Sequence, residues 1–388
     1  MRFPEFSGEW EETTLGKISE ITKGSGISKD QLSEQGSPCI LYGELYTKYK
    51  SEVIGVVYSR TELESSSLVK SKANDVIIPC SGETAIDIST ARCVPFNNIL
   101  LGGDLNIIRL KHDDGGFFAY QLNGARKKDI ARVAQGVSVV HLYGENLKHI
   151  RVYHPVIEEQ KKITRLLSLI DERIATQNKI IEKMESLIKG LSQRFLSPKQ
   201  GWTSYKLDEL CQIKSGYSGI QVSFQTAYKV SRIETISNHC INMSRIGFVK
   251  EIPQEYKLRV GDILFSNINS VQYIGNTAFI DKDYGLYHGM NLLRIVPDSR
   301  IVFPRFIHLL LCSERLLRHF QSICNKAVSQ ASINQTSLGK TIITIPSYKE
   351  QQHICSIIES VERKLDIETS LLKMIQYQKQ YLLRQMFI

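Results

Sequence analysis

The chain has 388 residues, of which 42% are hydrophobic and 23% charged, and its formal net charge is +9. These are ordinary globular values for a chain long enough for two or three domains, and the positive charge favours an anionic partner. No apolar run approaches about 18 residues and no apolar signal core opens the chain, so we expect a cytoplasmic protein without a membrane span. Eight scattered cysteines without zinc spacing predict reduced thiols and no metal site.

Residues 1–155 predict an irregular α/β domain with short strands. Apolar or alternating runs bounded by Gly, Asn, Asp and Ser favour strands at 76–78, 105–109 and 137–140. One helix is expected near 117–133.

Residues 156–197 predict a long helix. Apolar side chains recur there in alternating steps of four and three residues, which is the heptad seam of a coiled coil, and Pro198 ends the pattern. The seam begins with Ile163, Leu167, Ile170, Ile174 and the polar Gln177.

The second half repeats this order. Residues 198–346 predict another α/β domain, with strands near 262–265 and 291–296 and a helix near 304–324. Residues 347–388 predict a second long helix, opened by a capping-box pattern at Ser347 and Glu350 and interrupted in its seam by Lys379. This seam begins with Ile354, Ile358, Val361, Leu365 and the polar Glu368.

The two halves are copies of one domain. The segment that starts at Trp10 returns at Trp202, residues 106–109 return at 291–294, and Pro-x-x-x-Glu-Gln occurs at 155–160 and 346–351. A period this long indicates a duplicated domain rather than a solenoid of small repeats.

The duplication also suggests how the helices pair. Each seam lacks a partner in its own segment, and the ends of a compact domain usually lie close together, so the two helices should pack antiparallel. We therefore expect an α+β fold in which two homologous α/β domains are separated by two long antiparallel coiled-coil helices with pseudo-twofold symmetry. Gln177 and Glu368 are equivalent mid-helix positions. They either face each other in one polar layer or bend out to solvent.

No catalytic motif is complete. Gly339-Lys340-Thr341 lacks the earlier glycine of a phosphate-binding loop, and there is no G-x-G-x-x-G after a strand and no H-E-x-x-H. The histidines at 141, 149 and 154 fit no metal spacing. We expect the chain to catalyse nothing by itself and to bind no cofactor.

Recognition chemistry is present in both copies. Asn, Gln and Arg side chains read base edges, and Ser, Thr, Tyr and Lys suit phosphates. Each basic cluster alone could be a solvated helix face, but the duplication favours DNA. The candidates in the first copy are Tyr42, Glu44, Tyr46, Thr47, Lys48, Tyr49, Ser81, Glu83, Thr84, Arg126, Lys127, Gln135 and Ser138. Those in the second copy are Asn267, Asn269, Ser270, Tyr273, Tyr287, His288, Arg315, Arg318, Ser329 and Gln330.

The copies agree in framework but differ between its shared points, as in residues 25–70 and 217–258. Two scaffolds of one fold with different loops should recognise two different half-sites. The predicted target is a bipartite, asymmetric DNA sequence.

Over essentially its full length the chain resembles the specificity subunits of type I restriction-modification systems. The motifs that carry this resemblance are residues 3–6 with 8–10, 42–49 and 81–84, the repeated Pro-x-x-x-Glu-Gln, and the helix ends at 191–195 and 383–387. The resemblance implies target recognition domains at 1–155 and 198–346, alternating with spacer helices at 156–197 and 347–388.

It also implies partners. These are double-stranded DNA, two modification subunits that use S-adenosylmethionine to methylate adenine, and restriction (motor) subunits that need ATP and magnesium. The spacer helices and adjoining surfaces would dock these subunits.

Two other functions are kept as alternatives. One is an autonomous DNA methyltransferase or nuclease, which methyl transfer by the purified chain alone would indicate. The other is a coiled-coil adaptor that binds proteins. Steep loss of duplex binding between about 50 and 200 mM salt would favour DNA contacts over that adaptor.

Overall fold

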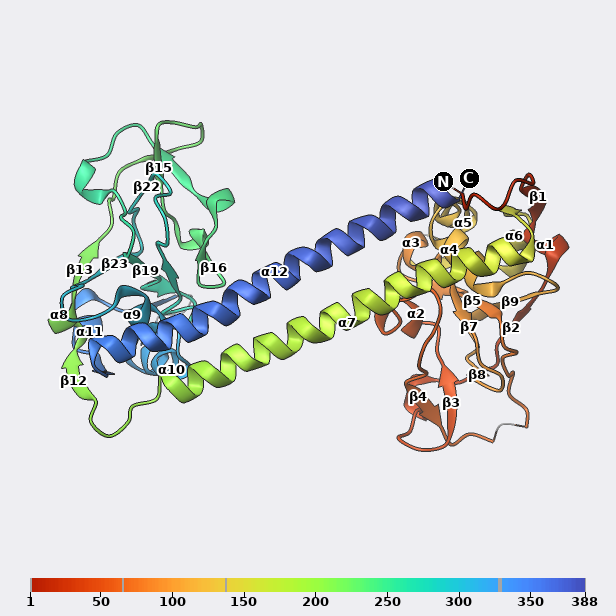
Figure 1. The fold of residues 1–388 in the computed structure, drawn as a ribbon, viewed down its shortest axis with the longest axis horizontal. Helices are drawn as coiled ribbons and strands as arrows, with labels where there is room; N and C mark the ends of the chain where they lie inside the picture. Colours follow the sequence, from red (N-terminus) through yellow and green to blue (C-terminus); the bar gives the residue numbers. More distant parts are fainter. Residues whose placement is uncertain (1, 65, 137, 327–329, 388) are drawn as a thin grey trace. The chain divides into compact units, whose positions relative to one another are not determined.

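The computed structural model describes residues 2–64, 66–136, 138–326 and 330–387. The chain forms two compact units (Figure 1). The first unit comprises Met1–Ile180 and Glu368–Ile388, and the second comprises Ile181–Ile367. Each unit therefore combines one α/β body with a segment of both long helices. Among the described residues, no helix is long and apolar enough to cross a membrane.

A four-stranded antiparallel sheet, β2-β9-β5-β7, lies at the centre of the first unit. Strand β5 (Asp75–Pro79) is buried along its whole length. Val76 and Ile78 pack in one apolar cluster while Ile77 packs in another, since alternate side chains point to opposite faces of a sheet. Both faces are covered, which explains why this strand is a continuous apolar run.

The other elements of the first unit surround this sheet. Its strands are β1 (Glu11–Thr14), β2 (Ser19–Lys23), β3 (Ser37–Ile40), β4 (Ser59–Thr61), β6 (Ser81–Gly82), β7 (Arg92–Val94), β8 (Leu100–Leu101), β9 (Leu105–Leu110), β10 (Val140–His141) and β11 (Arg151–His154). Its helices are α1 (Leu15–Ile18), α2 (Glu44–Thr47), α3 (Ala85–Ile88), α4 (Gly115–Asn123), α5 (Lys127–Val133), α6 (Gly144–Lys148) and the first part of α7 (Ile157–Phe195).

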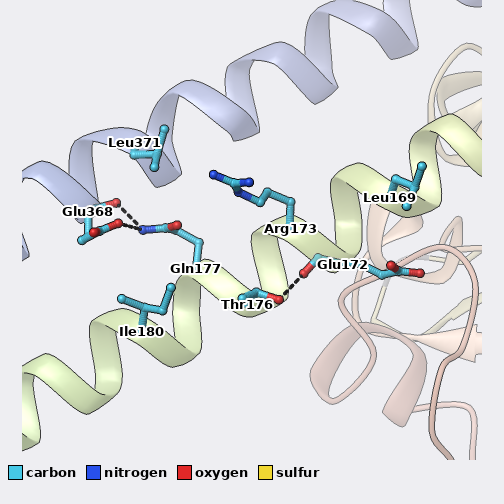
Figure 2. Close-up of a pocket in the computed structure, with 8 residues that line it drawn as sticks. All are labelled: Leu169, Glu172, Arg173, Thr176, Gln177, Ile180, Glu368 and Leu371. Carbon is cyan, nitrogen blue, oxygen red and sulfur yellow. Dashed lines mark hydrogen bonds between the residues drawn. The ribbon is translucent and has the colours of Figure 1, made fainter.

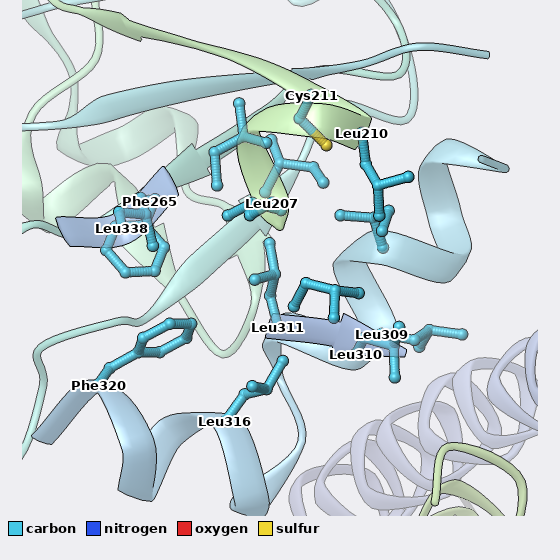
Figure 3. Close-up of a cluster of buried hydrophobic side chains, with 14 of the residues drawn as sticks. Leu207, Leu210, Cys211, Phe265, Leu309, Leu310, Leu311, Leu316, Phe320 and Leu338 are labelled. Carbon is cyan, nitrogen blue, oxygen red and sulfur yellow. The ribbon is translucent and has the colours of Figure 1, made fainter. Parts of the chain in front are cut away.

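The second unit repeats the central sheet as β13-β23-β19-β21, again antiparallel. Its apolar core contains Phe265, Leu310 and Phe320 (Figure 3). The strands are β12 (Thr203–Lys206), β13 (Cys211–Ser215), β14 (Gln221–Val222), β15 (Tyr228–Val230), β16 (Ile236–Ser237), β17 (Cys240–Ile241), β18 (Gly247–Val249), β19 (Ile263–Phe265), β20 (Ile268–Asn269), β21 (Thr277–Phe279), β22 (Leu286–Tyr287), β23 (Leu293–Pro297), β24 (Asn325–Lys326), β25 (Ala331–Ser332) and β26 (Ile342–Ile345). The helices are α8 (Leu207–Leu210), α9 (Pro304–Leu311), α10 (Glu314–Ile323), α11 (Gln335–Gly339) and the first part of α12 (Tyr348–Met386).

Two helices expected from the sequence are each divided. The segment 117–133 forms α4 and α5, because the chain turns at Gly124, whose backbone N–H donates to the Tyr120 carbonyl at 2.9 Å. The segment 304–324 forms α9 and α10, where Ser313 caps the second helix. The strand expected at 137–140 is reduced to the short β10, and Val137 lies outside the described residues.

The repeated framework residues make the same contacts in both units. Asp75 forms an ion pair with Arg109 at 2.7 Å, and Asp262 forms one with Arg294 at 2.6 Å. Each aspartate also accepts a hydrogen bond from the backbone N–H three residues before it. The sequence repeat therefore reflects one ion pair to a buried aspartate that joins the central strands in each copy.

The glutamine of the repeated helix-start motif also makes the same contacts in both units. Gln160 donates to the Pro155 carbonyl at 2.9 Å and accepts from the Asp114 backbone N–H at 2.9 Å. Gln351 donates to the Pro346 carbonyl at 3.0 Å and accepts from the Phe303 N–H at 2.8 Å. In both units this amide joins the first turn of the long helix to the loop that precedes α4 or α9.

The seam residues of the long helices are all buried or half-buried. In the first unit α7 and α12 run antiparallel, because Asp171 contacts Lys379 while the later Gln177 contacts the earlier Glu368. In the second unit Phe195 at the end of α7 and the next residue, Leu196, share a core with Ile354 near the start of α12. The predicted antiparallel pairing is confirmed within each unit.

Three details refine the helix prediction. The first seam residues, Ile163 and Leu167, pack in the core of their own α/β body. Lys379 does not disturb the seam, because its ammonium is held by two carboxylates. At the predicted capping box of α12, the Glu350 backbone N–H donates a hydrogen bond to the Ser347 hydroxyl at 3.4 Å.

Gly24 and Gly216 provide a test of the duplicated framework. A Cβ at either position would lie closer than 3.0 Å to a backbone carbonyl oxygen, that of Gly102 or of Gly289. We expect Gly24→Ala to lower the stability of the first unit by about 1–3 kcal/mol through overpacking. Thermal denaturation measures the effect. Gly26→Ala is the matched control, because no atom lies within 4 Å of its Cβ position, and an equal loss in both variants would contradict the explanation.

Candidate nucleic-acid interface

Two of the polar segments in the first unit meet on a short two-stranded sheet. Strand β6 pairs antiparallel with β10, so that Ser81 lies opposite His141. The backbone N–H of Gln135 donates to the His141 carbonyl at 2.9 Å, and the His141 N–H donates back at 2.7 Å. Ser81 and Gln135, which are far apart in the sequence, are thereby brought together. Ser138 is exposed in the turn between Gln135 and β10.

A third segment, residues 42–49, reaches the same region. Burial raises the pKa of Tyr46. The neighbouring ionisable groups of Tyr42, Asp87 and Glu83 raise it further, which places Tyr46 beside the turn that follows β6. Tyr42, Thr47 and Lys48 are exposed.

The segment 42–49 is not the loop expected from the sequence, because it contains α2. Glu44 is buried, accepts a hydrogen bond from the Leu41 N–H at 3.0 Å and forms an ion pair with Lys48 at 2.6 Å. Tyr49 is 4% exposed and stacks on Tyr58. The structure thus places Glu44 and Tyr49 inside the domain, where they hold the segment in position rather than present a surface to a partner.

The turn after β6 presents both polar and apolar groups. Thr84 caps α3 by accepting from the Asp87 N–H at 3.1 Å, and the Glu83 and Thr84 side chains are exposed. Ile86 and Val139 are each 51% exposed, and both were missed by the sequence reasoning. An isolated exposed apolar residue has no sequence signal of its own, since the chain pattern does not distinguish it from a core residue.

The basic residues at the start of α5 make more contacts within the protein than the residues of a solvated helix face would. Arg126 lies over the Tyr153 ring at 4.9 Å and forms an ion pair with Asp129 at 3.5 Å. Lys127 is half-buried and donates to the Thr90 hydroxyl at 3.4 Å. Burial lowers its pKa. Helix α5 contacts α3, so these residues flank the surface formed by the three segments.

The second unit builds an equivalent surface from β20, β25 and β24. Asn269 in β20 lies opposite Ala331 in β25, directly after the exposed Gln330. Asn267 donates to the Ile333 carbonyl at 3.3 Å. Ser270 and the exposed Tyr273 follow in the next turn. This arrangement is the counterpart of β6 and β10: Asn325 pairs with Ser332 of β25 as Gln135 pairs with His141, and the exposed Gln330 directly precedes β25 as Val139 precedes β10. Ser329 lies outside the described residues.

Four other predicted residues of the second unit lie elsewhere. Tyr287 in β22 is buried and its hydroxyl accepts a hydrogen bond from Gln254 at 3.1 Å. His288 is 1% exposed, its Nε2 contacts the Leu292 carbonyl at 2.9 Å, and burial lowers its pKa to about 4. These two side chains support the sheet. Arg315 and Arg318 are exposed on α10, where Arg318 pairs with Glu314.

The polar layer of the long helices lies in a groove between α7 and α12 (Figure 2). The Gln177 amide donates to the Glu368 carboxylate at 2.5 Å and to its backbone carbonyl at 3.2 Å. Gln177 is 2% exposed. Of the two arrangements that the sequence left open, the facing pair is therefore confirmed. A single buried polar pair in an apolar seam selects one register.

The comparisons with known proteins agree with this duplicated arrangement. A family model described as "Type I restriction modification DNA specificity domain" matches residues 7–186 and again 199–377. A putative type I restriction enzyme MjaX specificity subunit from Methanocaldococcus jannaschii is 32% identical over 194 residues, which are 48% of this chain and 46% of that protein. The match thus spans about half of that relative.

Two further similarities extend over almost the whole chain. The type I restriction enzyme MjaVIII specificity subunit from the same organism is 21% identical over 406 residues, 95% of this chain and 89% of that protein. The crystal structure of the type I restriction-modification system S subunit from M. genitalium has a TM-score of 0.65 at 16% identity, and the match covers 100% of this chain and 99% of that one. The latter shows a shared fold.

The Gln177–Glu368 layer predicts a measurable coupling. Glu368→Leu leaves the buried Gln177 amide without its carboxylate partner, so the free energy of unfolding should fall by about 1–3 kcal/mol. The double variant Gln177→Leu/Glu368→Leu should recover most of that loss, because neither polar group remains. Chemical denaturation of the four proteins of this double-mutant cycle measures the coupling, with Glu368→Gln as the conservative control. Additive effects would show that the layer contributes nothing as a pair.

Proposed function

The chain belongs to the family of type I restriction-modification DNA specificity domains, and from this membership we propose that it is the sequence-recognition subunit of a type I restriction-modification complex. It binds a bipartite, asymmetric duplex, one half-site per α/β body. The family that matches is one of DNA recognition and not of enzymes. The chain therefore supplies sequence specificity, while its partners supply the chemistry.

One observation carries the proposal. Equivalent short sheets, β6 with β10 and β20 with β25, lie on one shared framework in both units, and each has an exposed glutamine, Gln135 or Gln330, beside it. Amide side chains such as Gln135 and Gln330 can bond a base edge with two hydrogen bonds in the major groove. Duplicated polar surfaces fit a target with two halves.

The differences between the units support two unlike half-sites. In the first unit the segment before β5 contains α2, β3 and β4, and β3 pairs with β4 and with the later β8. In the second unit the segment before β19 contains β14, β15 and β18, which pair with one another and, through β15, with the later β22. Each central sheet is kept while the segment that lies beside the candidate surface is rebuilt, so the two surfaces read different bases.

The long helices supply a docking face for partner subunits. On α12, Ile367, Met374, Tyr377 and Tyr381 are 66%, 60%, 71% and 55% exposed, and they follow one another in steps of seven, three and four residues. On α7, Leu169, Ile180 and Leu187 are exposed as well. Such a stripe outside the seam is the pattern of a face that packs against further helices.

We assign this face to the modification subunits, two per chain, with restriction subunits joining them. In this assignment S-adenosylmethionine, ATP and magnesium are bound by the partners, and the assembly works in the cytoplasm, where the cell's DNA is. The chain itself contributes no cofactor ligand. Double-stranded DNA is its own direct partner.

A domain exchange tests the proposal. Replacing residues 198–346 with the equivalent domain of another family member should change one half-site of the methylated sequence and leave the other unchanged. Sequencing of modified adenines in a host that carries the assembled complex measures both half-sites. A change in both half-sites, or in neither, would overturn the assignment of one half-site to each unit.

Two exposed amide side chains, one in each unit, test the surfaces themselves. Gln135→Ala should relax the first half-site at one base pair, and Gln330→Ala should relax the second, each by about 1–3 kcal/mol of discrimination. Binding of the assembled complex to a panel of singly substituted duplexes measures this, and each variant is the control for the other. Uniform weakening across all sequences would instead indicate phosphate contacts.

A further inference from the structure

Lys379 is a charged residue at a seam position of α12, where the heptad pattern calls for an apolar one. Its ammonium contacts the Asp171 carboxylate of α7 at 2.5 Å and the Glu52 carboxylate at 2.6 Å. It also lies 5.5 Å from the centre of the Tyr120 ring. The Lys379 side chain is 13% exposed, and those of Asp171 and Glu52 are 7% and 9% exposed. This is a buried ion network, not a surface pair.

Two further side chains complete the network. The Tyr120 hydroxyl donates to Asp171 at 2.7 Å. The buried guanidinium of Arg92 donates to the Tyr49 carbonyl at 2.9 Å. Burial lowers the pKa of Arg92, and the nearby carboxylates of Glu52 and Asp171 oppose that effect by raising it. The carboxylates of Glu52 and Asp171 therefore balance the charges of Lys379 and Arg92.

The network touches the base of the 42–49 segment. Glu52 comes three residues after Tyr49, and its carbonyl accepts a hydrogen bond from the Cys93 N–H at 2.8 Å. The Ile54 N–H donates to the Cys93 carbonyl at 3.0 Å. Residues 52–54 are thus held against β7, and the segment that carries Tyr42 and Tyr46 leads directly into them. Through Lys379 this anchor is joined to both long helices.

Stability alone does not account for these charges. Replacing a buried ion network with well-packed apolar residues is often neutral or stabilising, whereas ionic groups constrain direction and distance. The second unit uses another arrangement. A shift of 191 positions places Glu362 at the site of Asp171, and Glu362 pairs with Arg305 of α9 at 2.6 Å; the same shift places Ile188 at the site of Lys379. The network belongs to the first unit.

We propose that Lys379 is a positioning residue that holds the DNA-reading segment 42–49 in a defined place on the helix pair, so that reading of the first half-site depends on the packing of α7 and α12. The proposal rests on the proposed function. It adds that a residue near the C-terminal end of the chain determines how well the N-terminal domain discriminates bases.

The test uses the assembled complex and a charge-balanced variant, Asp171→Asn/Lys379→Met. This variant removes one charge of each sign and leaves Arg92 with Glu52, and the introduced asparagine can still accept a hydrogen bond from Tyr120. We expect its melting temperature to stay close to that of the unchanged protein. Its discrimination against substitutions in the first half-site should fall about tenfold, the size of one base contact, while discrimination at the second half-site is unchanged. Ile188→Met is the matched control and should alter neither half-site.

The outcomes separate the two proposals. A variant that folds and discriminates at both half-sites like the unchanged protein overturns the positioning role. If the double variant does not fold, Lys379→Arg decides, because it keeps the charge but moves the contacts. A loss confined to the first half-site then supports the role, and unchanged discrimination overturns it. Absence of sequence-specific binding by the unchanged complex would instead overturn the proposed function.

Discussion

The structure depends on the fact that neither α/β body closes its core with its own segment alone. In the first unit, Met386 and Phe387 at the end of α12 are buried with Trp10, Phe117 and the first turns of α7. In the second unit, Leu196 after α7 and the start of α12 complete the core. Each long helix therefore contributes apolar surface to both units. The antiparallel course of the pair is required by this packing, because each body needs the beginning of one helix and the end of the other.

On this base the two units keep a small set of framework contacts. The Asp75–Arg109 pair and its counterpart Asp262–Arg294 join two central strands, and the amides of Gln160 and Gln351 join each long helix to its α/β body. These contacts are internal and concern the fold. Between them the chain is free to differ, and the largest differences lie in the segments that precede β5 and β19. The proposed reading of two half-sites needs this separation of constant and variable parts.

The buried polar groups of the helix pair have a different character from the framework contacts. The Gln177–Glu368 layer and Lys379 both occupy seam positions, where a heptad pattern ordinarily has apolar residues. Hydrogen bonds and ion pairs depend on direction and distance, so they favour one register over its neighbours where apolar side chains tolerate several. Under the proposed function, in which the helices connect two reading surfaces and accept partner subunits, one defined register has a functional use.

The sequence by itself determined the duplication, the two long helices and their antiparallel pairing, because these follow from repeat spacing and heptad periodicity, which are properties of the chain order. It placed Gln177 and Glu368 at equivalent positions, and the structure decided that they face each other. It also identified the segments at 42–49, 81–84 and 135–138, and comparable polar stretches in the second copy, which has no counterpart of the 42–49 motif. Only the tertiary structure decided which of their side chains are on the surface. Glu44, Tyr49 and His288 look like recognition residues in sequence but are buried, whereas the exposed Ile86 and Val139 gave no signal. In the sequence Lys379 looks like an interruption of the seam, because its partners Asp171 and Glu52 lie far from it along the chain; Glu52 is 327 positions away. Contacts over such separations leave no periodic pattern in the sequence.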